Sequence, residues 1–438
     1  MTSYNFVSSK VSSLQGDITV PGDKSISHRA IMLGAISKGT TTVSGFLDGE
    51  DCLSTLHAFQ AMGVKIEGPF SQRVVIHGVG KYGLKKPNNI INCGNSGTTM
   101  RLLTGILAAQ EFDTELTGDS SLLKRPMERV SRPLKQMGAD LRTTAGLPPI
   151  FIKGGQQLNG ISYEMPVASA QVKSCLLLAG MYANGETEVI ETGLTRDHTE
   201  RMLTAFSYPI YKSDNSITIN SQSEGQGTDV IVPGDISSAA FFIVAATIIP
   251  NSELVIRNVG INPTRTGIIQ ILQLMGADIE IANKRLCGEE MVADIYVRHA
   301  PLEGIDIPAA MVPIAIDEFP IIFIAASCAK GKTTIHGAVE LRCKESDRIV
   351  AMADGLETLG IDAEVLEDGI IIHGGEILGG SVESRNDHRI AMSFAIAGAV
   401  AKEPIIIKNC SNVATSFPNF VTLANRINLS IVETKDEQ

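Results

Sequence analysis

The segment PGDKSISHRA, residues 21–30, places two cations and two hydroxyl groups at the predicted start of a helix. Lys24 lies on the preceding turn, and Ser25, His28 and Arg29 follow at the i, i+3 and i+4 spacing of one helical stripe. A helix N-terminus already carries about half a positive charge and unpaired N–H groups. Cations added there are unfavourable unless an anion binds. The segment is therefore a candidate anion-binding site.

Five further segments share this pattern of short polar residues followed by a small, apolar run. They are NCGNSGTTMRLL from Asn92, PVASAQVKSCLL from Pro166, VPGDISSAAFFI from Val232, AIDEFPIIFIAA from Ala315 and SRNDHRIAMSFA from Ser384. Each begins with residues typical of a helix cap. Each continues for about a dozen residues with little polar face, which indicates a buried helix that is too short to span a bilayer.

A second feature repeats with the same period of roughly 70 residues. The segments TLHAFQAMGVKIE, PLKQMGADLR, IIQILQLMGADIEI and GLETLGIDAEV each predict an amphipathic helix, a glycine cap and a strand. TERMLTAFSYPIY and VTLANRINLSIV are divergent copies without the glycine. We therefore predict an α/β fold of six copies of one unit, three to a domain. If the buried helices run side by side, their positive ends meet.

Several residues at these predicted helix starts could bind or react with an anion. They are Asn95, Ser96, Gly97, Thr98 and Arg101 in the second copy, Lys124 and Arg125 on the loop after it, Ser169, Gln171 and Lys173 in the third, and Asn386, His388 and Arg389 in the sixth. In the fifth copy, Asp317 and Glu318 are acids, and a carboxylate among cations is a candidate general base. In ELRCKESDRI we expect a helix on which Lys344 and Arg348 share a face, with Glu345 able to pair with Arg348.

Composition limits the classes of function. The chain has 438 residues and a net charge of −11, with a pI near 5.3, which argues against a nucleic-acid or membrane-surface protein. No apolar run approaches about 18 residues, and the N-terminus does not resemble a secretion signal. Seven cysteines without metal-like spacing predict reduced thiols in the cytoplasm, and Cys93 and Cys410 are expected to be buried and inert.

Two segments look like nucleotide-binding motifs, but neither has the context that such a site needs. GVGKYG at residues 78–83 matches GxGxxG, yet no helix follows, so we expect a turn. GKTT at 331–334 has alanine where a P-loop needs its upstream glycine. The eight histidines show no HxH or HExxH spacing. We expect neither a cofactor nor a metal.

Eight motifs, in order along almost the whole chain, resemble the 5-enolpyruvylshikimate-3-phosphate synthase family. They are PGDKSISHRA, NSGTTMRLL, KRPM, SAQVKS, RDHTE, KESDR, NDHRIAMSFAI and TSFP. The resemblance implies a two-domain inside-out α/β barrel, each domain built from three βαβαββ repeats with buried parallel helices. It implies an N-terminal domain of residues 22–234, a C-terminal domain of 1–21 with 235–438, and an active site in the cleft between them.

The resemblance also implies a reaction and residue roles. The enolpyruvyl group of phosphoenolpyruvate would move to the 5-hydroxyl of shikimate 3-phosphate, releasing phosphate. Shikimate 3-phosphate would bind to Lys24, Ser25, Arg29, Ser169, Ala170, Gln171, Asp317, Lys344 and Arg196. Phosphoenolpyruvate would bind to Lys24, Gly97, Arg125, Gln171, Arg348 and Arg389. Asp317 would take the hydroxyl proton, and Glu345, with Lys24, would protonate the methylene carbon.

SAQVK, RDHTE and NDHR are similar to the second class of these enzymes, which is associated with tolerance to glyphosate. Leu102, Ala170 and Thr415 depart from the first-class pattern, which has Pro, Ser and Lys there. Thr415 leaves one cation near phosphoenolpyruvate unassigned, with Lys173 or His388 as candidates. Gly97 matches the first class, so tolerance cannot come from a bulkier residue at that position. We predict weaker inhibition by glyphosate than in the first class.

Three other functions compete with this interpretation. A UDP-N-acetylglucosamine enolpyruvyl transferase would carry a cysteine on the loop GDSSLLKRPM, which has none. An RNA 3′-phosphate cyclase would need a basic face and a nucleotide site. A non-catalytic anion-binding clamp would have no need of Asp317 and Glu345 among its cations. We expect a cytoplasmic monomer that binds neither nucleic acid nor membrane.

Overall fold

The structure is a computed structural model that describes residues 4–435, and the chain divides into two compact units. The unit called here the N-terminal unit comprises Gly22–Val232 and the short segment Cys287–Glu289. The C-terminal unit comprises the chain up to Pro21, Pro233–Leu286, and the chain from Glu290 onwards. The C-terminal unit is therefore assembled from segments far apart in the sequence.

Six helices are buried along almost their whole length, as their apolar sequences predict. They are α1 (Lys24–Ile36), α3 (Gly97–Leu107) and α5 (Ala170–Gly180) in the N-terminal unit, and α7 (Ile236–Ile248), α9 (Phe319–Ser327) and α11 (His388–Gly398) in the C-terminal unit. Every residue of α7 and α9 is buried. In the N-terminal unit α3 packs on α5, and in the C-terminal unit α9 packs on α11.

Six more helices have one exposed face. They are α2 (Glu50–Ala61), α4 (Glu128–Gln136), α6 (His198–Ala205), α8 (Gly267–Leu274), α10 (Arg348–Thr358) and α12 (Phe420–Arg426). The predicted glycine caps have positive φ, at Gly63, Gly138, Gly276 and Gly360. In the two divergent copies Ser207 and Asn428 take the same left-handed conformation, with φ of 65° and 73°.

The N-terminal unit has three four-stranded sheets of one topology. Their strand orders are β14 (Asp229–Ile231), β3 (Lys38–Ser44), β5 (Arg73–Val79), β4 (Lys65–Phe70); β6 (Ile91–Asn92), β7 (Thr114–Thr117), β9 (Leu147–Ile152), β8 (Leu141–Thr144); and β10 (Ser162–Glu164), β11 (Glu186–Ile190), β13 (Ser216–Asn220), β12 (Ile210–Lys212). The first two strands of each order are parallel and the other pairs are antiparallel. The second and third sheets, with their helices, follow the predicted βαβαββ order.

The C-terminal unit has two four-stranded sheets, each with one strand supplied by the start of the chain, and one three-stranded antiparallel sheet. The orders are β16 (Asp278–Cys287), β17 (Glu290–Arg298), β15 (Glu253–Gly260), β2 (Gln15–Thr19); β18 (Lys332–Ile335), β20 (Ile370–His373), β19 (Ala363–Val365); and β21 (Gly380–Glu383), β22 (Ile405–Lys408), β1 (Tyr4–Ser9), β23 (Ser430–Lys435). β2 runs parallel to β15, and β1 lies antiparallel between β22 and β23.

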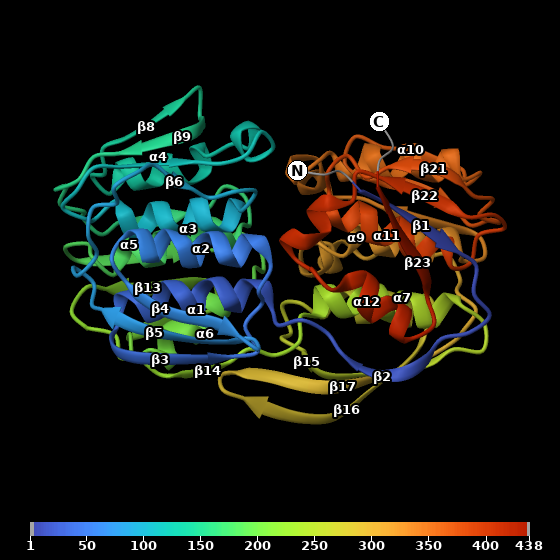
Figure 1. The fold of residues 1–438 in the computed structure, drawn as a ribbon. Coiled ribbons are helices and arrows are strands. Elements are labelled where there is room, and N and C mark those ends of the chain that lie inside the picture. The colour runs from blue at the N-terminus through green and yellow to red at the C-terminus, as the bar shows by residue number, and fades with distance from the viewer. Residues whose placement is uncertain (1–3, 436–438) are drawn as a thin grey trace. The chain divides into compact units, whose positions relative to one another are not determined.

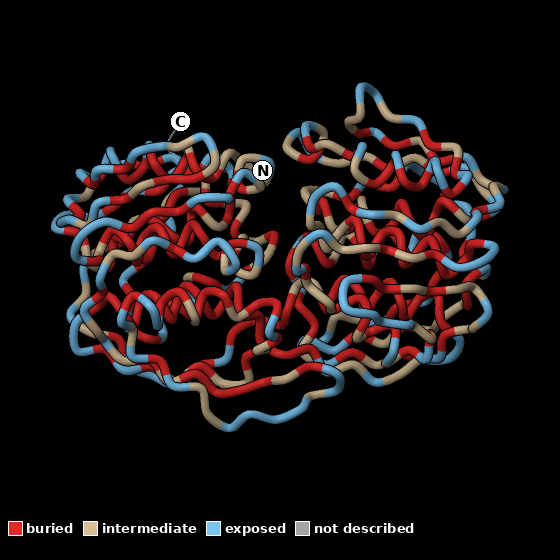
Figure 2. The backbone as a smooth tube through the Cα atoms, turned by 180° about the vertical axis from the view of Figure 1, so that it is seen from behind, coloured by how far each residue is buried: buried red, intermediate tan, exposed pale blue. Residues whose placement is uncertain are grey.

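Within each unit the sheets lie outside and the apolar helices lie inside (Figure 1). The inner helices are almost wholly buried, whereas most exposed residues lie on the outside of each unit (Figure 2). Sheets can cover a core with one apolar face, but a helix that is apolar all round must be surrounded. The predicted α/β fold with buried helices is confirmed.

The two motif-like segments are ordinary secondary structure. GVGKYG begins in β5 and continues into a turn, and most of GKTT forms β18, which follows α9. Among residues 4–435, no helix is both long enough and apolar enough to cross a membrane.

Candidate active site

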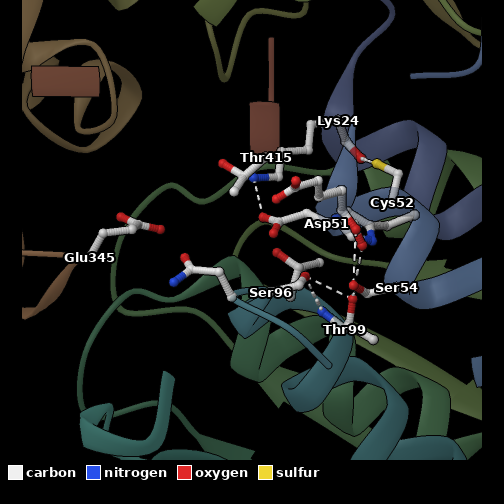
Figure 3. Close-up of polar contacts among 12 residues, drawn as sticks. Lys24, Asp51, Cys52, Ser54, Ser96, Thr99, Glu345 and Thr415 are labelled. Carbon is white, nitrogen blue, oxygen red and sulfur yellow. Dashed lines mark hydrogen bonds and ion pairs between the residues drawn. The ribbon is translucent and has the colours of Figure 1, made fainter. Parts of the chain in front are cut away.

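The first anion site predicted from the sequence lies at the start of α1. Asp23 caps the helix, and its Oδ1 accepts a hydrogen bond of 2.9 Å from the N–H of Ile26. Lys24 is the first helical residue rather than part of the preceding turn, and its Nζ pairs with Asp51 (Figure 3). No signal in the sequence pointed to Asp51, because acids are common in the first turn of a helix, where they interact favourably with the helix dipole, and Asp51 lies in the first turn of α2.

Arg29 is fixed by three helices. Its Nε donates to Thr199 Oγ1 at 2.6 Å and its Nη2 to Ser174 Oγ at 2.8 Å. Its Nη1 donates to the carbonyl oxygen of Ser25 at 2.9 Å. These three hydrogen bonds hold the guanidinium in one orientation.

At the start of α3, a glycine lies between two guanidinium groups. Ser96 caps the helix, and its Oγ accepts from the N–H of Thr99 at 3.0 Å (Figure 3). A Cβ atom on Gly97 would lie 3.0 Å from Arg101 Nη1 and 3.2 Å from Arg125 Nη1. Glycine therefore lets the backbone approach both cations closely.

The start of α5 is joined to that of α3. Ser169 caps α5 and Ala170 begins it. Gln171 accepts from Arg101 Nη1 at 2.6 Å and donates to Thr98 Oγ1 at 3.0 Å. The structure thus links Gln171 to the Gly97 region through Arg101, to which the sequence had given no specific role.

Two predicted cations lie beside α6. Lys173 is 1 % exposed, and its Nζ lies 2.9 Å from Glu191 Oε1 and 2.6 Å from Glu200 Oε1. Two carboxylates neutralise it, so we drop Lys173 as the candidate for the cation missing at Thr415. Arg196 is half-buried, two residues before α6.

In the C-terminal unit, one carboxylate joins two of the predicted cations. Asp317 Oδ1 lies 3.1 Å from Lys344 Nζ and 3.5 Å from Arg348 Nη1. The expected helix through Lys344 and Arg348 is wrong, because a 3₁₀ helix (Val339–Cys343) ends before Lys344. Asp347 then caps α10 by accepting two backbone N–H groups, so the helix begins only at Arg348.

Arg348 is buried among acids. Its Nε pairs with Asp387 Oδ2 at 2.8 Å, and its Nη2 pairs with Glu345 Oε2 at 2.7 Å, which confirms the predicted i, i+3 pair. Burial alone would lower the pKa of Arg348, but the charges of Asp387, Glu345 and Asp317 hold it above its ordinary value. The guanidinium is therefore always charged.

The start of α11 carries the last predicted cation. Asp387 caps the helix by accepting from the N–H of Arg389 at 2.9 Å. Arg389 Nη1 lies 3.6 Å from Glu318 Oε1. Thr415 ends a 3₁₀ helix (Ser411–Thr415), and its hydroxyl donates to the carbonyl oxygen of Asn412 at 2.7 Å. Thr415 therefore supplies no positive charge.

Cys93 and Cys410 do not provide a nucleophile. Cys93 and Cys410 are buried, and burial raises the pKa of each thiol to about 12, which confirms the expectation that they are inert. In the part of the chain that the structure describes, no three His, Cys, Asp or Glu residues form a group that could hold a metal ion.

The chemistry of the two units differs. The N-terminal unit gathers cations and helix N-termini, which bind phosphate and carboxylate groups. The C-terminal unit places Asp317 and Glu345 in contact with Arg348, so it offers carboxylates for proton transfer beside a cation for an anionic substrate. Phosphate binding combined with acid–base chemistry is what the residues support.

Comparison with known proteins gives a consistent result. The family model described as EPSP synthase (3-phosphoshikimate 1-carboxyvinyltransferase) matches residues 8–423. The chain is 68 % identical over 429 residues to the 3-phosphoshikimate 1-carboxyvinyltransferase of Legionella pneumophila strain Philadelphia 1, covering 98 % of this chain and 99 % of that one. It is 61 % identical over 419 residues to the enzyme of that name from Methylococcus capsulatus, covering 95 % and 96 %. A solved structure of EPSP synthase from Acinetobacter baumannii superposes with a TM-score of 0.88 at 55 % identity, covering 99 % of this chain and 100 % of that one.

Proposed function

The chain belongs to the EPSP synthase family, and we propose on that premise how its residues carry out the reaction. The enolpyruvyl group of phosphoenolpyruvate is transferred to the 5-hydroxyl of shikimate 3-phosphate, giving 5-enolpyruvylshikimate 3-phosphate and phosphate, a step in aromatic amino acid biosynthesis. The observation that best supports the catalytic assignment is the carboxylate of Asp317, which lies beside the cations of Lys344 and Arg348.

We propose that the N-terminal unit binds most of shikimate 3-phosphate. The starts of α1 and α5 supply Lys24, Ser25, Arg29, Ser169, Ala170 and Gln171, and Arg196 comes from the loop before α6. Two features support the assignment: helix N-termini favour a phosphate, and hydrogen bonds to Thr199 and Ser174 fix the orientation of the Arg29 guanidinium. Lys344 and Asp317 complete the binding site from the C-terminal unit.

Phosphoenolpyruvate would bind to cations of both units. Lys24, Gly97, Arg125 and Gln171 come from the N-terminal unit, and Arg348 and Arg389 come from the C-terminal unit. Support comes from the guanidinium groups beside Gly97 and from the permanent charge of Arg348. The active site then lies between the domains, which we assign as residues 22–234 and as 1–21 with 235–438. Ligand charge would offset the repulsion between cations and favour domain closure.

The proposed reaction is an addition followed by an elimination. Asp317 takes the proton of the 5-hydroxyl as the oxygen bonds to C2 of phosphoenolpyruvate, and Glu345, which enters this step in its protonated form and is assisted by Lys24, protonates C3. In the elimination Glu345 removes a proton from the new methyl group while the bond from C2 to the phosphate oxygen breaks. The proton held by Asp317 leaves with phosphate, so both carboxylates return to their initial state.

Phosphate release tests this proposal. With phosphoenolpyruvate present, we expect release with shikimate 3-phosphate as acceptor and none with UDP-N-acetylglucosamine. Asp317→Asn keeps the size of the side chain but cannot accept the proton, so kcat should fall by about 10²–10⁴-fold while shikimate 3-phosphate still binds. Release with the nucleotide sugar alone would favour the rival transferase. No release with either acceptor would leave an anion-binding clamp.

We propose further that glyphosate inhibits by occupying the phosphoenolpyruvate site, and that inhibition is weaker than in first-class enzymes because the chain follows the second-class pattern. Thr415 supports this, since it supplies no cation. Inhibition as tight as in the first class would contradict the assignment.

The last elements of the proposal are a monomeric state and a cytoplasmic location. Light scattering should give a mass near 46.7 kDa in solution, and a dimer mass would contradict the monomer. Cys93, Cys175 and Cys410 are buried free thiols, which are typical of a reducing compartment.

A further inference from the structure

In the C-terminal unit, every buried helix begins with an acid that meets an arginine. The pairs are Asp235 with Arg265 at 3.0 Å, Glu318 with Arg389 at 3.6 Å and Asp387 with Arg348 at 2.8 Å. In the N-terminal unit the corresponding caps are Asp23, Ser96 and Ser169, of which only the first is acidic. Because the acid–arginine pairs recur in one unit, these acids are candidates for a function other than helix capping.

Glu318 is the acid in this series that does not cap its own helix. Asp235 and Asp387 each accept a backbone N–H of the first turn at 2.9 Å, whereas Glu318 makes no such bond to α9. Its side chain is only 1 % exposed, and its Oε2 is buried without a hydrogen-bond partner among the described residues. A buried carboxylate is costly unless its charge is used, and the cation that it meets is Arg389.

A rigid support stands behind Glu318. Ser237 Oγ donates to Glu318 Oε1 and also accepts from Arg265 Nη2 at 2.7 Å. Arg265 is in turn anchored by Asp235. These contacts join the starts of α7 and α9 and prevent the carboxylate of Glu318 from turning away.

The chain of contacts ends at Arg389, which is more exposed than Arg265. The side chain of Arg265 is 3 % exposed, whereas that of Arg389 is 13 % exposed. Glu318 contacts Nη1 of Arg389 and so constrains one edge of its guanidinium. A fixed guanidinium binds an anion with less loss of conformational entropy than a mobile one.

We propose that Glu318 is a positioning residue, which orients the guanidinium of Arg389 toward the anionic groups of phosphoenolpyruvate, with Ser237 and Arg265 holding Glu318 in place. The inference rests on the proposed role of Arg389. It assigns to Glu318 no contact with substrate and no part in proton transfer.

Glu318→Gln tests the inference, because glutamine keeps the size and can still accept from Ser237 but has no charge to hold Arg389. The expected result is a rise of about tenfold in KM for phosphoenolpyruvate. The values of kcat and of KM for shikimate 3-phosphate should stay within about twofold of wild type. Asp354→Asn is the matched control, because Asp354 pairs with Arg385 on the exposed surface of the same unit, and its kinetics should be unchanged.

Two outcomes would overturn the positioning role. One is an unchanged KM for phosphoenolpyruvate in Glu318→Gln. The other is a fall in kcat with similar rises in the KM values of both substrates and a lower melting temperature. That result would mean that Glu318 only stabilises the fold. Ser237→Ala gives a second test if Glu318→Gln does not fold, and it should raise the same KM by a smaller factor.

A double-mutant cycle separates this inference from the function on which it rests. If Glu318 acts through Arg389, the variant that combines Glu318→Gln with Arg389→Lys should have the same KM for phosphoenolpyruvate as Arg389→Lys alone. Additive effects would overturn the inference and leave the role of Arg389 intact. A normal KM in Arg389→Lys would overturn both.

Discussion

Replacing Lys173 with methionine should destabilise the N-terminal unit without impairing the binding of phosphoenolpyruvate. The Lys173 side chain is 1 % exposed, and its ammonium group lies between Glu191 and Glu200. Methionine fills a similar volume without charge. Glu191 is 17 % exposed and keeps the hydroxyl of Thr195 as a partner. Glu200 is 2 % exposed, and its second oxygen is buried without a hydrogen-bond partner. Most of the destabilisation should therefore come from leaving the charge of Glu200 uncompensated.

The magnitude follows from this burial. Removing one partner of a buried ion pair costs about 3–5 kcal/mol, because the remaining charge is left uncompensated in a poorly polarisable environment. For units of about 150–250 residues, each kcal/mol lowers the melting temperature by about 2–4 °C. We therefore expect a decrease of about 6–20 °C in the transition of the N-terminal unit.

Thermal unfolding followed by far-ultraviolet circular dichroism is the suitable assay, since the chain contains no tryptophan for fluorescence. A second variant combining Lys173→Met with Glu200→Gln removes the stranded charge and should recover at least half of the lost stability. A loss below about 1 kcal/mol in the single variant would refute the structural role. So would a large rise in KM for phosphoenolpyruvate at unchanged stability, which would restore Lys173 as a ligand.

Three other substitutions or reactions test separate parts of the structure. In Gly97→Ala the new methyl group must displace the guanidinium of Arg101, 3.0 Å away, so KM for phosphoenolpyruvate should rise about tenfold in steady-state kinetics, and an unchanged value would contradict the crowding. Burial first, and then two neighbouring cations, hold the pKa of His28 well below its usual range. Below about pH 6.5 the unfolded chain binds a proton at His28 that the folded chain does not bind. As the pH falls, the free energy of unfolding of wild type, measured by denaturant titration, should therefore decrease by up to about 1.4 kcal/mol per pH unit relative to that of His28→Asn. Parallel plots of unfolding free energy against pH for the two proteins would contradict this. At about pH 8 a thiol reagent should label the exposed Cys343 quickly and leave Cys93 unreacted until the protein unfolds.

The fold was predictable because its signals are local and repeated. Six apolar helices with polar starts, and six amphipathic helices at the same period, define the units without any tertiary information. The glycines after four of the outer helices marked their ends, and Ser207 and Asn428 show that the two copies without glycine keep the same backbone. Strand partners were harder to predict, since β1 and β2 pair with strands hundreds of residues away.

The site was only partly predictable, because a motif names residues but not their partners. The cations of the helix starts follow from the pattern, whereas the pairing of Lys24 with Asp51 depends on how α2 packs against α1. Lys344 was wrongly expected on a helix, since the cap at Asp347 decides where α10 begins. Glu318 could not be distinguished from an ordinary helix-start acid until its contact with Arg389 was known.

The placement of β1 has a consequence for the order in which the protein folds during synthesis. Phe6 pairs with Ile407 on one side and with Glu433 on the other, so the strand made first must wait for strands made last. The main segment of the N-terminal unit, Gly22–Val232, emerges from the ribosome in one continuous stretch and can fold while the remainder is being translated. Until translation is nearly complete, β1 has two unpaired edges, which makes it the segment most in need of protection by a chaperone.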